Sequence, residues 1–553
     1  MLIILLAFIL TLPGCLWIGS EAKPPDNPGE NGEEEPDPEE EARRREEEWR
    51  KRNAELKEEL GPYYVPLPHP DQLEEKPRVK ARAVYLTGHS AGRPDKMEQI
   101  IQLIEETELN AVVIDIKDDN GKMSYQSEIE AVNDIDAYFD NHPIADIRAT
   151  LKDLKERGIY AIGRIVVFRD IDVFPTKKPE WCIPLKSGGI YRDKRGFAYG
   201  NPFIEELWDY HIAIAKEAAL LGFDEIQFDY IRFPDNAAYL DKVVDFPGRN
   251  GRAKAEAIRG FVEKARRELA PYNVYLAYDV FGVVATYWGD KDDIGQRWED
   301  FPPNCDYICP MIYPGHYGPY WFGLEIPNNH PKATITAALT DALKHNALVN
   351  KPAIIRPWLQ AHDATWLGAG RYIHYGPAQI REQIDAARAL GIDEYMLWDA
   401  SNKNYPREAF FSEAEAERRY EQARQERESK GHDLLGRTAR KAAEAYLEAL
   451  AKLDWMEAYP LQQGFKGGYG AYRDWLLNVP GRVKEWRIGG VDNNGNKAGI
   501  SLSVTLTLDG EEISLDDEKW SMLKENNVWR VKPSSRFLEI ISGESEASKG
   551  QEQ

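Results

Sequence analysis

Short apolar strand patterns alternate with helical patterns from residue 80 to about residue 403. Eight segments have the strand pattern: 82–89, 110–119, 160–168, 225–234, 274–282, 305–314, 351–360 and 394–401. Between them, apolar residues recur at helical spacing, for example over 147–158 and 204–222. Eight strands alternating with helices predict an α/β fold of the (β/α)8 TIM-barrel type. A doubly wound sheet is the alternative, but no glycine-rich phosphate turn follows the first strand.

The connections between these segments differ in length at the two ends of the predicted barrel. Helix-to-strand turns are short and contain glycine, as in "LKERGIY" (154–160). The strand-to-helix connections are long, at 169–203, 235–251, 315–332 and 361–376. Long loops at one end only indicate the carboxyl-terminal face of a barrel, where active sites are built.

The segments outside the barrel have other compositions. Residues 2–12 form an apolar run of signal-peptide length, and "LPGC", ending at Cys15, resembles a bacterial lipobox. We expect an exported protein that is lipid-anchored through Cys15 on the outer face of a cell membrane, or secreted. Residues 436–535 combine an amphipathic helix with antiparallel strand patterns, similar to small NTF2-like α+β folds. The predicted divisions are a signal segment 1–15, a disordered or charged-helix linker 16–79, the barrel 80–405, a charged helical linker 406–435, the small α+β domain 436–535 and a disordered tail 536–553.

Charge and composition narrow the classes of partner. The formal net charge of −23 argues against nucleic acid as the main partner, because nucleic-acid binding needs a basic surface. The 15 Trp and 28 Tyr provide many flat aromatic faces of the kind that pack against sugar rings. The ten His form no H-E-x-x-H or H-x-H pair, and the Cys lack zinc spacing, so we expect no metal and no cofactor.

The fourth strand pattern, "EIQFDYI", places a carboxylate inside the barrel. Ile226, Phe228 and Tyr230 form its apolar set, which we expect to face the helices. Gln227 and Asp229 then point into the lumen, with Asp229 near the carboxyl-terminal rim. A lumen carboxylate is costly unless it is paired or hydrated, and this rim is the usual place for a catalytic acid.

The other strand ends carry polar and aromatic residues as well. Asp279 ends the fifth strand in the way that Asp229 ends the fourth. On the second strand, Asp115, Lys117 and Asp119 share one parity. The remaining candidates are Arg164, Arg232, Tyr313, His316, Arg356, Trp358, Gln360, Trp398 and Asp399. Carboxylates, aromatic platforms and hydrogen-bonding groups at one rim indicate a cleft for an oligosaccharide or polysaccharide.

The motifs "AVYLTGHSAG", "LNAVVIDIKDDNG", "GRIVVFRD", "GFDEIQFDYIRFP", "YDVFG" and "CDYICPMIYPGHY" resemble a glycoside hydrolase family of bacterial exported proteins, DUF4015. The resemblance covers the whole barrel and implies a TIM-barrel fold and glycosidase activity. Strand four is also similar to the chitinase-type signature, but Ile231 stands where the acid Glu is expected. In amylase-type barrels, acids on strands four and five are nucleophile and proton donor. That likeness implies Asp229 as nucleophile or base and Asp279 as general acid, or the reverse, although Gln227 replaces the usual Arg.

These observations favour an exported glycoside hydrolase that acts on a polysaccharide through two rim carboxylates. The alternative is a catalytically inactive carbohydrate-binding barrel that serves as an envelope scaffold, which the departures at Gln227 and Ile231 favour. A polysaccharide deacetylase would need a metal triad that the sequence lacks. Serine-hydrolase chemistry is disfavoured because "GHSAG" does not match G-x-S-x-G.

Overall fold

The computed structural model describes residues 38–73, 76–235 and 237–543. The chain divides into two compact units, Met1–Lys51 and Arg52–Gln553. The predicted signal segment and Cys15 lie outside the described residues. The charged helix expected within 16–79 is α1 (Pro38–Leu60). The linker prediction is wrong near its end, since Val65 is buried in the barrel's core and its carbonyl accepts a hydrogen bond from the Tyr272 hydroxyl at 3.0 Å.

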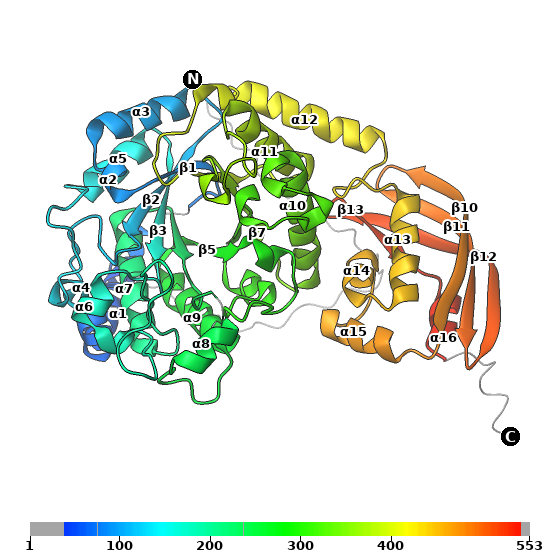
Figure 1. Ribbon diagram of the computed structural model, residues 1–553, viewed down its shortest axis with the longest axis horizontal. Helices are drawn as coiled ribbons and strands as arrows, with labels where there is room; N and C mark the ends of the chain where they lie inside the picture. The colour runs from blue at the N-terminus through cyan, green and yellow to red at the C-terminus, as the bar shows by residue number, and fades with distance from the viewer. Residues whose placement is uncertain (1–37, 74–75, 236, 544–553) are drawn as a thin grey trace, which may run out of the picture. The chain divides into compact units, whose positions relative to one another are not determined.

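The second unit contains a closed barrel of parallel strands (Figure 1). Its strands are β1 (Arg82–Leu86), β2 (Ala111–Lys117), β3 (Tyr160–Val166), β4 (Glu225–Asp229), β5 (Tyr275–Phe281), β6 (Tyr307–Met311), β7 (Ile354–Ile355), β8 (Trp358–Gln360) and β9 (Tyr395–Trp398). The order is β5-β4-β3-β2-β1-β9-β8-β6-β7, and pairing of β5 with β6 closes the ring. The prediction of an eight-position TIM barrel is therefore confirmed.

The seventh barrel position is shared by two short strands. We expected one strand over 351–360, but β7 and β8 are separated by Arg356 and Pro357, and both pair with β6. Proline has no N–H to donate to the ladder, which accounts for the interruption.

Helices surround the barrel strands (Figure 1). They are α2 (Gly88–Ala91), α3 (Pro94–Glu105), α4 (Glu130–Asp134), α5 (Ile147–Glu156), α6 (Val173–Lys177), α7 (Glu205–Leu221), α8 (Ala237–Val243), α9 (Lys254–Leu269), α10 (Pro331–Leu348) and α11 (Pro377–Ala389). Residues 282–306, all of which are described, join β5 to β6 through 3-10 turns in place of a helix. The four long connections predicted from the sequence precede α7, α9, α10 and α11, at the carboxyl ends of the strands.

Two separate cores follow from the alternation of side chains along the strands. The larger core lies between strands and helices and includes Ile226 and Phe228, as expected from their parity. The smaller core fills the lumen and includes Ala83, Val113 and Met396. The lumen is therefore packed with side chains, and polar groups in it need partners from neighbouring strands.

The carboxyl-terminal part has its own core. After the charged helix α12 (Glu413–Ser429) come α13 (Ala439–Lys452), α14 (Trp455–Ala458), α15 (Tyr469–Asn478), β10 (Arg482–Asn494), β11 (Lys497–Leu508), β12 (Glu511–Glu525), β13 (Val528–Lys532) and α16 (Ser535–Ile541). The four strands form one antiparallel sheet in sequence order. This is the predicted small α+β domain, and its NTF2-like character stays a prediction.

The disordered tail was predicted to begin too early. Residues 535–541 form α16, because Ser534 caps the helix and Phe537 is buried against Trp520, with ring centroids 4.8 Å apart. Across the described ranges of the chain, no helix is long and apolar enough to span a bilayer.

Candidate active site

Asp229 is the last residue of β4 and lies at the top of the lumen. Its Oδ2 accepts hydrogen bonds from Arg164 Nε at 3.1 Å and Nη2 at 2.6 Å, and its Oδ1 accepts one from the backbone N–H of Tyr230 at 2.6 Å. Tyr230 has a φ of 51°, which is unusual for a bulky residue. Three donors, two of them on the Arg164 guanidinium, thus surround the Asp229 side chain, and this residue is only 4% exposed.

Arg164 joins two carboxylates of neighbouring strands. On its other side, its Nη1 donates to Asp115 Oδ1 at 2.6 Å, and the Tyr85 hydroxyl donates to Asp115 Oδ2. Burial raises the pKa of Asp115 to about 6, although the Arg164 charge and the Tyr85 hydrogen bond oppose the rise. Tyr85 was missed by the sequence interpretation, although its position at the end of the first strand carries the same parity signal.

Asp279 lies on β5 in a different environment. Its Oδ1 accepts a hydrogen bond from Trp358 Nε1 at 2.7 Å, whereas its Oδ2 is buried without a hydrogen-bond partner. The side chain is 1% exposed. Burial raises the pKa of Asp279 well above its usual range, and the negative charge of Asp229 raises it further. Both effects favour the protonated form of Asp279, whereas Asp229 accepts hydrogen bonds from Arg164 and Tyr230.

Aromatic rings line the space around these carboxylates. Trp398 stacks on Tyr85 with ring centroids 4.1 Å apart, and the Arg164 guanidinium lies 5.1 Å from the Trp398 ring centroid. Trp358 meets Trp398 edge-on at 5.5 Å. Tyr313 belongs to the same lumen cluster as Trp358, and His316 is exposed beside Tyr313. The structure thus brings together seven sequence-predicted residues within the rim and lumen: Asp115, Arg164, Asp229, Asp279, Tyr313, Trp358 and Trp398.

Lys117 does not point into the lumen as its parity predicted. A register shift between β2 and β3 pairs Asp115 with Arg164 but Lys117 with Ile165. This bulge turns Lys117 toward the helix layer, where it donates to the Val166 carbonyl at 3.0 Å and lies 3.6 Å from Asp170. Asp119 remains near the rim, 3.7 Å from Arg169.

Arg356 belongs to the opposite end of the barrel. It is fully buried and donates to Glu225, the first residue of β4, at 2.7 Å and to Glu394 at 3.0 Å. Because these carboxylates stand at or before the start of their strands, they lie at the amino-terminal face, where barrel residues serve stability. The predicted role of Arg356 in substrate binding is therefore wrong.

Gln360 and Asp399 organise rim loops. Gln360 accepts a hydrogen bond from the Gly315 N–H and donates to the His362 carbonyl, each at 2.8 Å. Asp399 accepts from the backbone N–H groups of Lys403 at 2.7 Å and Asn404 at 2.8 Å. Both side chains form hydrogen bonds with backbone groups of the rim loops. Their role is therefore to position these loops, in place of the predicted contact with substrate.

Arg232 and Tyr230 occupy the loop that follows β4. Arg232 donates to Asp235 at 2.9 Å, and its guanidinium lies 4.0 Å from the centroid of the Phe281 ring. Tyr230 does not join the apolar face of β4, because its left-handed backbone turns it out of the strand, and the Arg169 guanidinium lies 4.5 Å from its ring.

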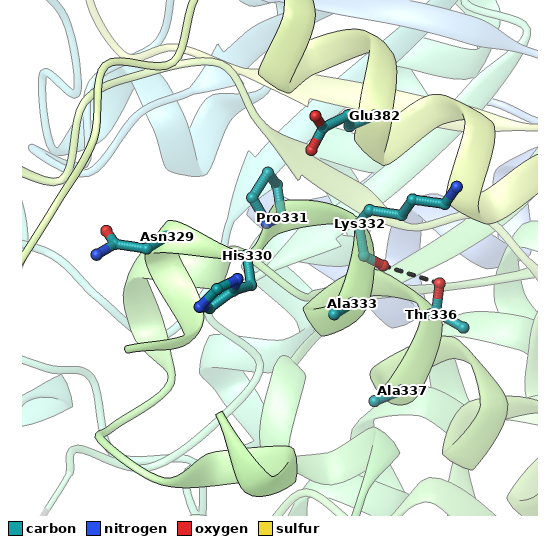
Figure 2. A pocket seen from close by; sticks show the side chains of 8 residues that line it. All are labelled: Asn329, His330, Pro331, Lys332, Ala333, Thr336, Ala337 and Glu382. Atoms are coloured by element: carbon teal, nitrogen blue, oxygen red, sulfur yellow. Dashed lines mark hydrogen bonds between the residues drawn. The ribbon is translucent and has the colours of Figure 1, made fainter. Parts of the chain in front are cut away.

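A pocket of about 680 Å³ lies elsewhere, at the amino end of α10 (Figure 2). Its lining contains none of the predicted site residues: it consists of Asn329, His330, Pro331, Lys332, Ala333, Thr336, Ala337 and Glu382. The one hydrogen bond drawn there, from Thr336 Oγ1 to the Lys332 carbonyl at 2.8 Å, is ordinary helical back-bonding. Within the described residues, no group of three His, Cys, Asp or Glu side chains could hold a metal ion.

Asp229 and Asp279 lie near the carboxyl ends of adjacent barrel strands, the end of a TIM barrel where active sites are built. The fold is that of the TIM-barrel enzymes. A family model described as "Putative glycosyl hydrolase domain" (DUF4015) matches residues 83–405, and the chain belongs to this family. The comparison with curated proteins gives no match.

Solved structures provide further similarities. A hypothetical protein from Ruminiclostridium thermocellum is 40% identical over 36% of this chain and 97% of its own, with a TM-score of 0.33. The PgaB (BpsB) glycoside hydrolase domain from Bordetella bronchiseptica is 17% identical over 60% of this chain and 99% of its own, with a TM-score of 0.42. The α-galactosidase TtGalA from Thermus thermophilus is 13% identical over 64% of this chain and 63% of its own, with a TM-score of 0.37. These scores are too low to transfer substrate or mechanism.

Proposed function

We propose that this protein is an exported, lipid-anchored glycoside hydrolase that cleaves a cell-surface or environmental polysaccharide with Asp279 as proton donor and Asp229 as its charged partner. The observation that carries the proposal is the contrast between the two carboxylates. Asp279 has one oxygen without a hydrogen-bond partner, and burial raises its pKa well above the usual range, whereas Asp229 receives three hydrogen bonds.

In the proposed reaction, Asp279 Oδ2 gives its proton to the glycosidic oxygen as the bond from that oxygen to the anomeric carbon breaks. Asp229 meets the positive charge that develops at the anomeric carbon. In a retaining reaction its oxygen forms the new bond, and water later replaces it with Asp279 as base. In an inverting reaction it takes a proton from the attacking water. The anomeric form of the first product, read by NMR, distinguishes the two.

Arg164 is the positioning residue in this account. It holds Asp229 through Nε and Nη2 and is itself fixed by Asp115 and by the Trp398 ring. Such support keeps a reacting carboxylate in place without contact to the substrate.

The test is a hydrolysis screen against a panel of polysaccharides with wild type, Asp229→Asn and Asp279→Asn. Each substitution keeps the side chain's shape and is expected to lower kcat by about 10²–10⁴-fold, the usual contribution of a general acid or base. Asp153→Asn, at a half-exposed carboxylate on the outer helix α5 that pairs with Arg157 at 3.1 Å, serves as the control and is expected to retain most of the activity. Wild-type activity that survives both Asp substitutions would contradict the assignment.

The burial of both carboxylates favours one second candidate. At 4% and 1% exposure, Asp229 and Asp279 reach a sugar only after rim side chains move. A carbohydrate-binding scaffold would leave them closed. Binding of a glycan without release of sugar by the wild type, at any pH between 4 and 8, would favour the scaffold.

A further inference from the structure

An exposed tryptophan stands on the long loop between β8 and α11. Trp366 is 56% exposed, in the 3-10 turn Thr365–Leu367. The flat face of an exposed indole matches the C–H face of a pyranose ring. The sequence interpretation did not select this residue, because no strand pattern points to it.

Four rings connect this tryptophan with the carboxylate site. The Trp366 centroid lies 5.6 Å from that of His362 and 6.0 Å from that of His316. Both imidazoles in turn contact Tyr313, with centroids 6.0 Å and 4.9 Å away. Tyr313 packs in the lumen cluster with Trp358, whose indole holds Asp279. We call Trp366, His362, His316 and Tyr313 the aromatic strip.

The loop that carries Trp366 is held in place by its own hydrogen bonds. Asp363 accepts from the Tyr375 N–H at 2.7 Å, and the Leu367 N–H donates to the Ala364 carbonyl at 3.0 Å. His362 Nδ1 lies 3.0 Å from the Trp398 carbonyl oxygen, which ties the strip to the end of β9. A platform fixed in this way loses little conformational freedom when it binds.

The imidazole of His362 in the strip is partly buried. Burial lowers the pKa of His362, which favours the uncharged ring. An uncharged row of rings suits an uncharged pyranose and gives no specific attraction to a uronic acid carboxylate.

We propose that the aromatic strip is an outer binding subsite, in which Trp366 stacks on an uncharged pyranose of a glycan chain whose cleaved bond lies at Asp229 and Asp279. The proposal rests on the function proposed above, because the occupant is the same chain. It predicts a preference for long glycans, because an imidazole and the Tyr313 ring lie between Trp366 and Trp358, the residue that holds Asp279.

The experiment uses the full chain carrying Asp279→Asn, so that binding is measured without hydrolysis. The probes are hexasaccharides and disaccharides of β-1,4-glucose, β-1,4-N-acetylglucosamine, β-1,4-xylose and α-1,4-glucose, titrated by calorimetry. We expect Trp366→Ala to weaken hexasaccharide binding about tenfold, the effect of burying one ring face. Disaccharide binding should not change, and Trp366→Phe should restore most of the affinity.

Tyr239→Ala is the matched control, because Tyr239 is 54% exposed on α8 and belongs to no part of the strip. Equal losses from Trp366→Ala and Tyr239→Ala would overturn the subsite, as would equal losses for both chain lengths or no binding of any hexasaccharide. Length-dependent binding that needs Trp366, in a protein whose wild type hydrolyses nothing, would support the subsite while contradicting the proposed catalysis. Hydrolysis that depends on Asp279 but is unaffected by Trp366→Ala with long chains would support the proposed catalysis and contradict the subsite.

Discussion

Burial favours a proton on Asp279 at pH values at which the unfolded chain would release it. Its pKa is raised by burial first and by the charge of Asp229 second. Between the ordinary aspartate pKa of about 3.9 and the raised value, the folded protein binds more protons than the unfolded one. The free energy of unfolding therefore falls as pH rises through this window, and the penalty is complete above the raised pKa.

Asp279→Asn should remove this penalty. The amide oxygen still accepts from Trp358, and no buried charge forms at high pH. We expect the variant to be more stable than wild type at pH 8, by about 1.4 kcal/mol for each unit of pKa shift, and to lose part of the stability difference between pH 5 and pH 8. Urea unfolding at both pH values measures this. Asp115 and Asp170, whose pKa values burial raises to about 6, contribute equally in both proteins to the change of the free energy of unfolding with pH. Identical slopes for variant and wild type would refute the account.

At the scale of elements, the bulge in β2 decides which side chains reach the site. It lets Asp115 face the lumen and sends Lys117 to the helix layer. On the neighbouring strand β3, Gly163 leaves room for the Ile116 side chain. A Cβ on Gly163 would lie 2.4 Å from Ile116 Cδ1 and 3.1 Å from Phe223 Cδ1.

Gly163→Ala is therefore expected to overpack this junction and lower the free energy of unfolding by about 1–3 kcal/mol. It should also reduce activity, because Gly163 and Ile116 directly adjoin Arg164 and Asp115. Gly499→Ala, at a strand glycine where an added Cβ would meet no atom within 4 Å, is the control and should be nearly neutral. Chemical denaturation of both variants measures the difference. An unchanged free energy of unfolding for Gly163→Ala would contradict this expectation, because it would mean that the bulge adjusts to the added methyl group at little cost.

Alternation of side chains sufficed to predict the strands and the lumen positions of Gln227, Asp229 and Asp279. It failed wherever the strand was irregular. The bulge reversed Lys117, and the positive φ of Tyr230 ended β4 early. Arg356 keeps the lumen parity of its strand, but it comes early in the strand and pairs with Glu225 at the amino-terminal face. Alternation could not predict the roles of loop residues. Their hydrogen bonds to backbone groups, such as those of Asp399, depend on tertiary contacts that a local sequence pattern does not contain.

For the whole molecule, the proposal places the barrel outside the cell on a lipid anchor. The sequence before residue 16 supports this through the apolar run and Cys15. Expressed in a bacterial host with labelled palmitate, wild type should carry the label and fractionate with membranes. Cys15→Ala should be unlabelled and lose membrane association that resists high salt. Label on the Cys15→Ala variant, or its absence from wild type, would contradict the anchor.

The central claim is that Asp279 gives a proton to the leaving group and Asp229 supplies the opposing charge. Its most direct test is the hydrolysis of two aryl glycosides of the sugar that the screen releases, one with a 2,4-dinitrophenolate leaving group and one with phenolate. Dinitrophenolate needs no proton to depart, so Asp279→Ala should cleave it at nearly the wild-type rate of bond breaking while losing about 10²–10⁴-fold on the phenyl glycoside. Asp229→Ala should lose activity on both. Equal losses of Asp279→Ala on the two substrates would contradict the account.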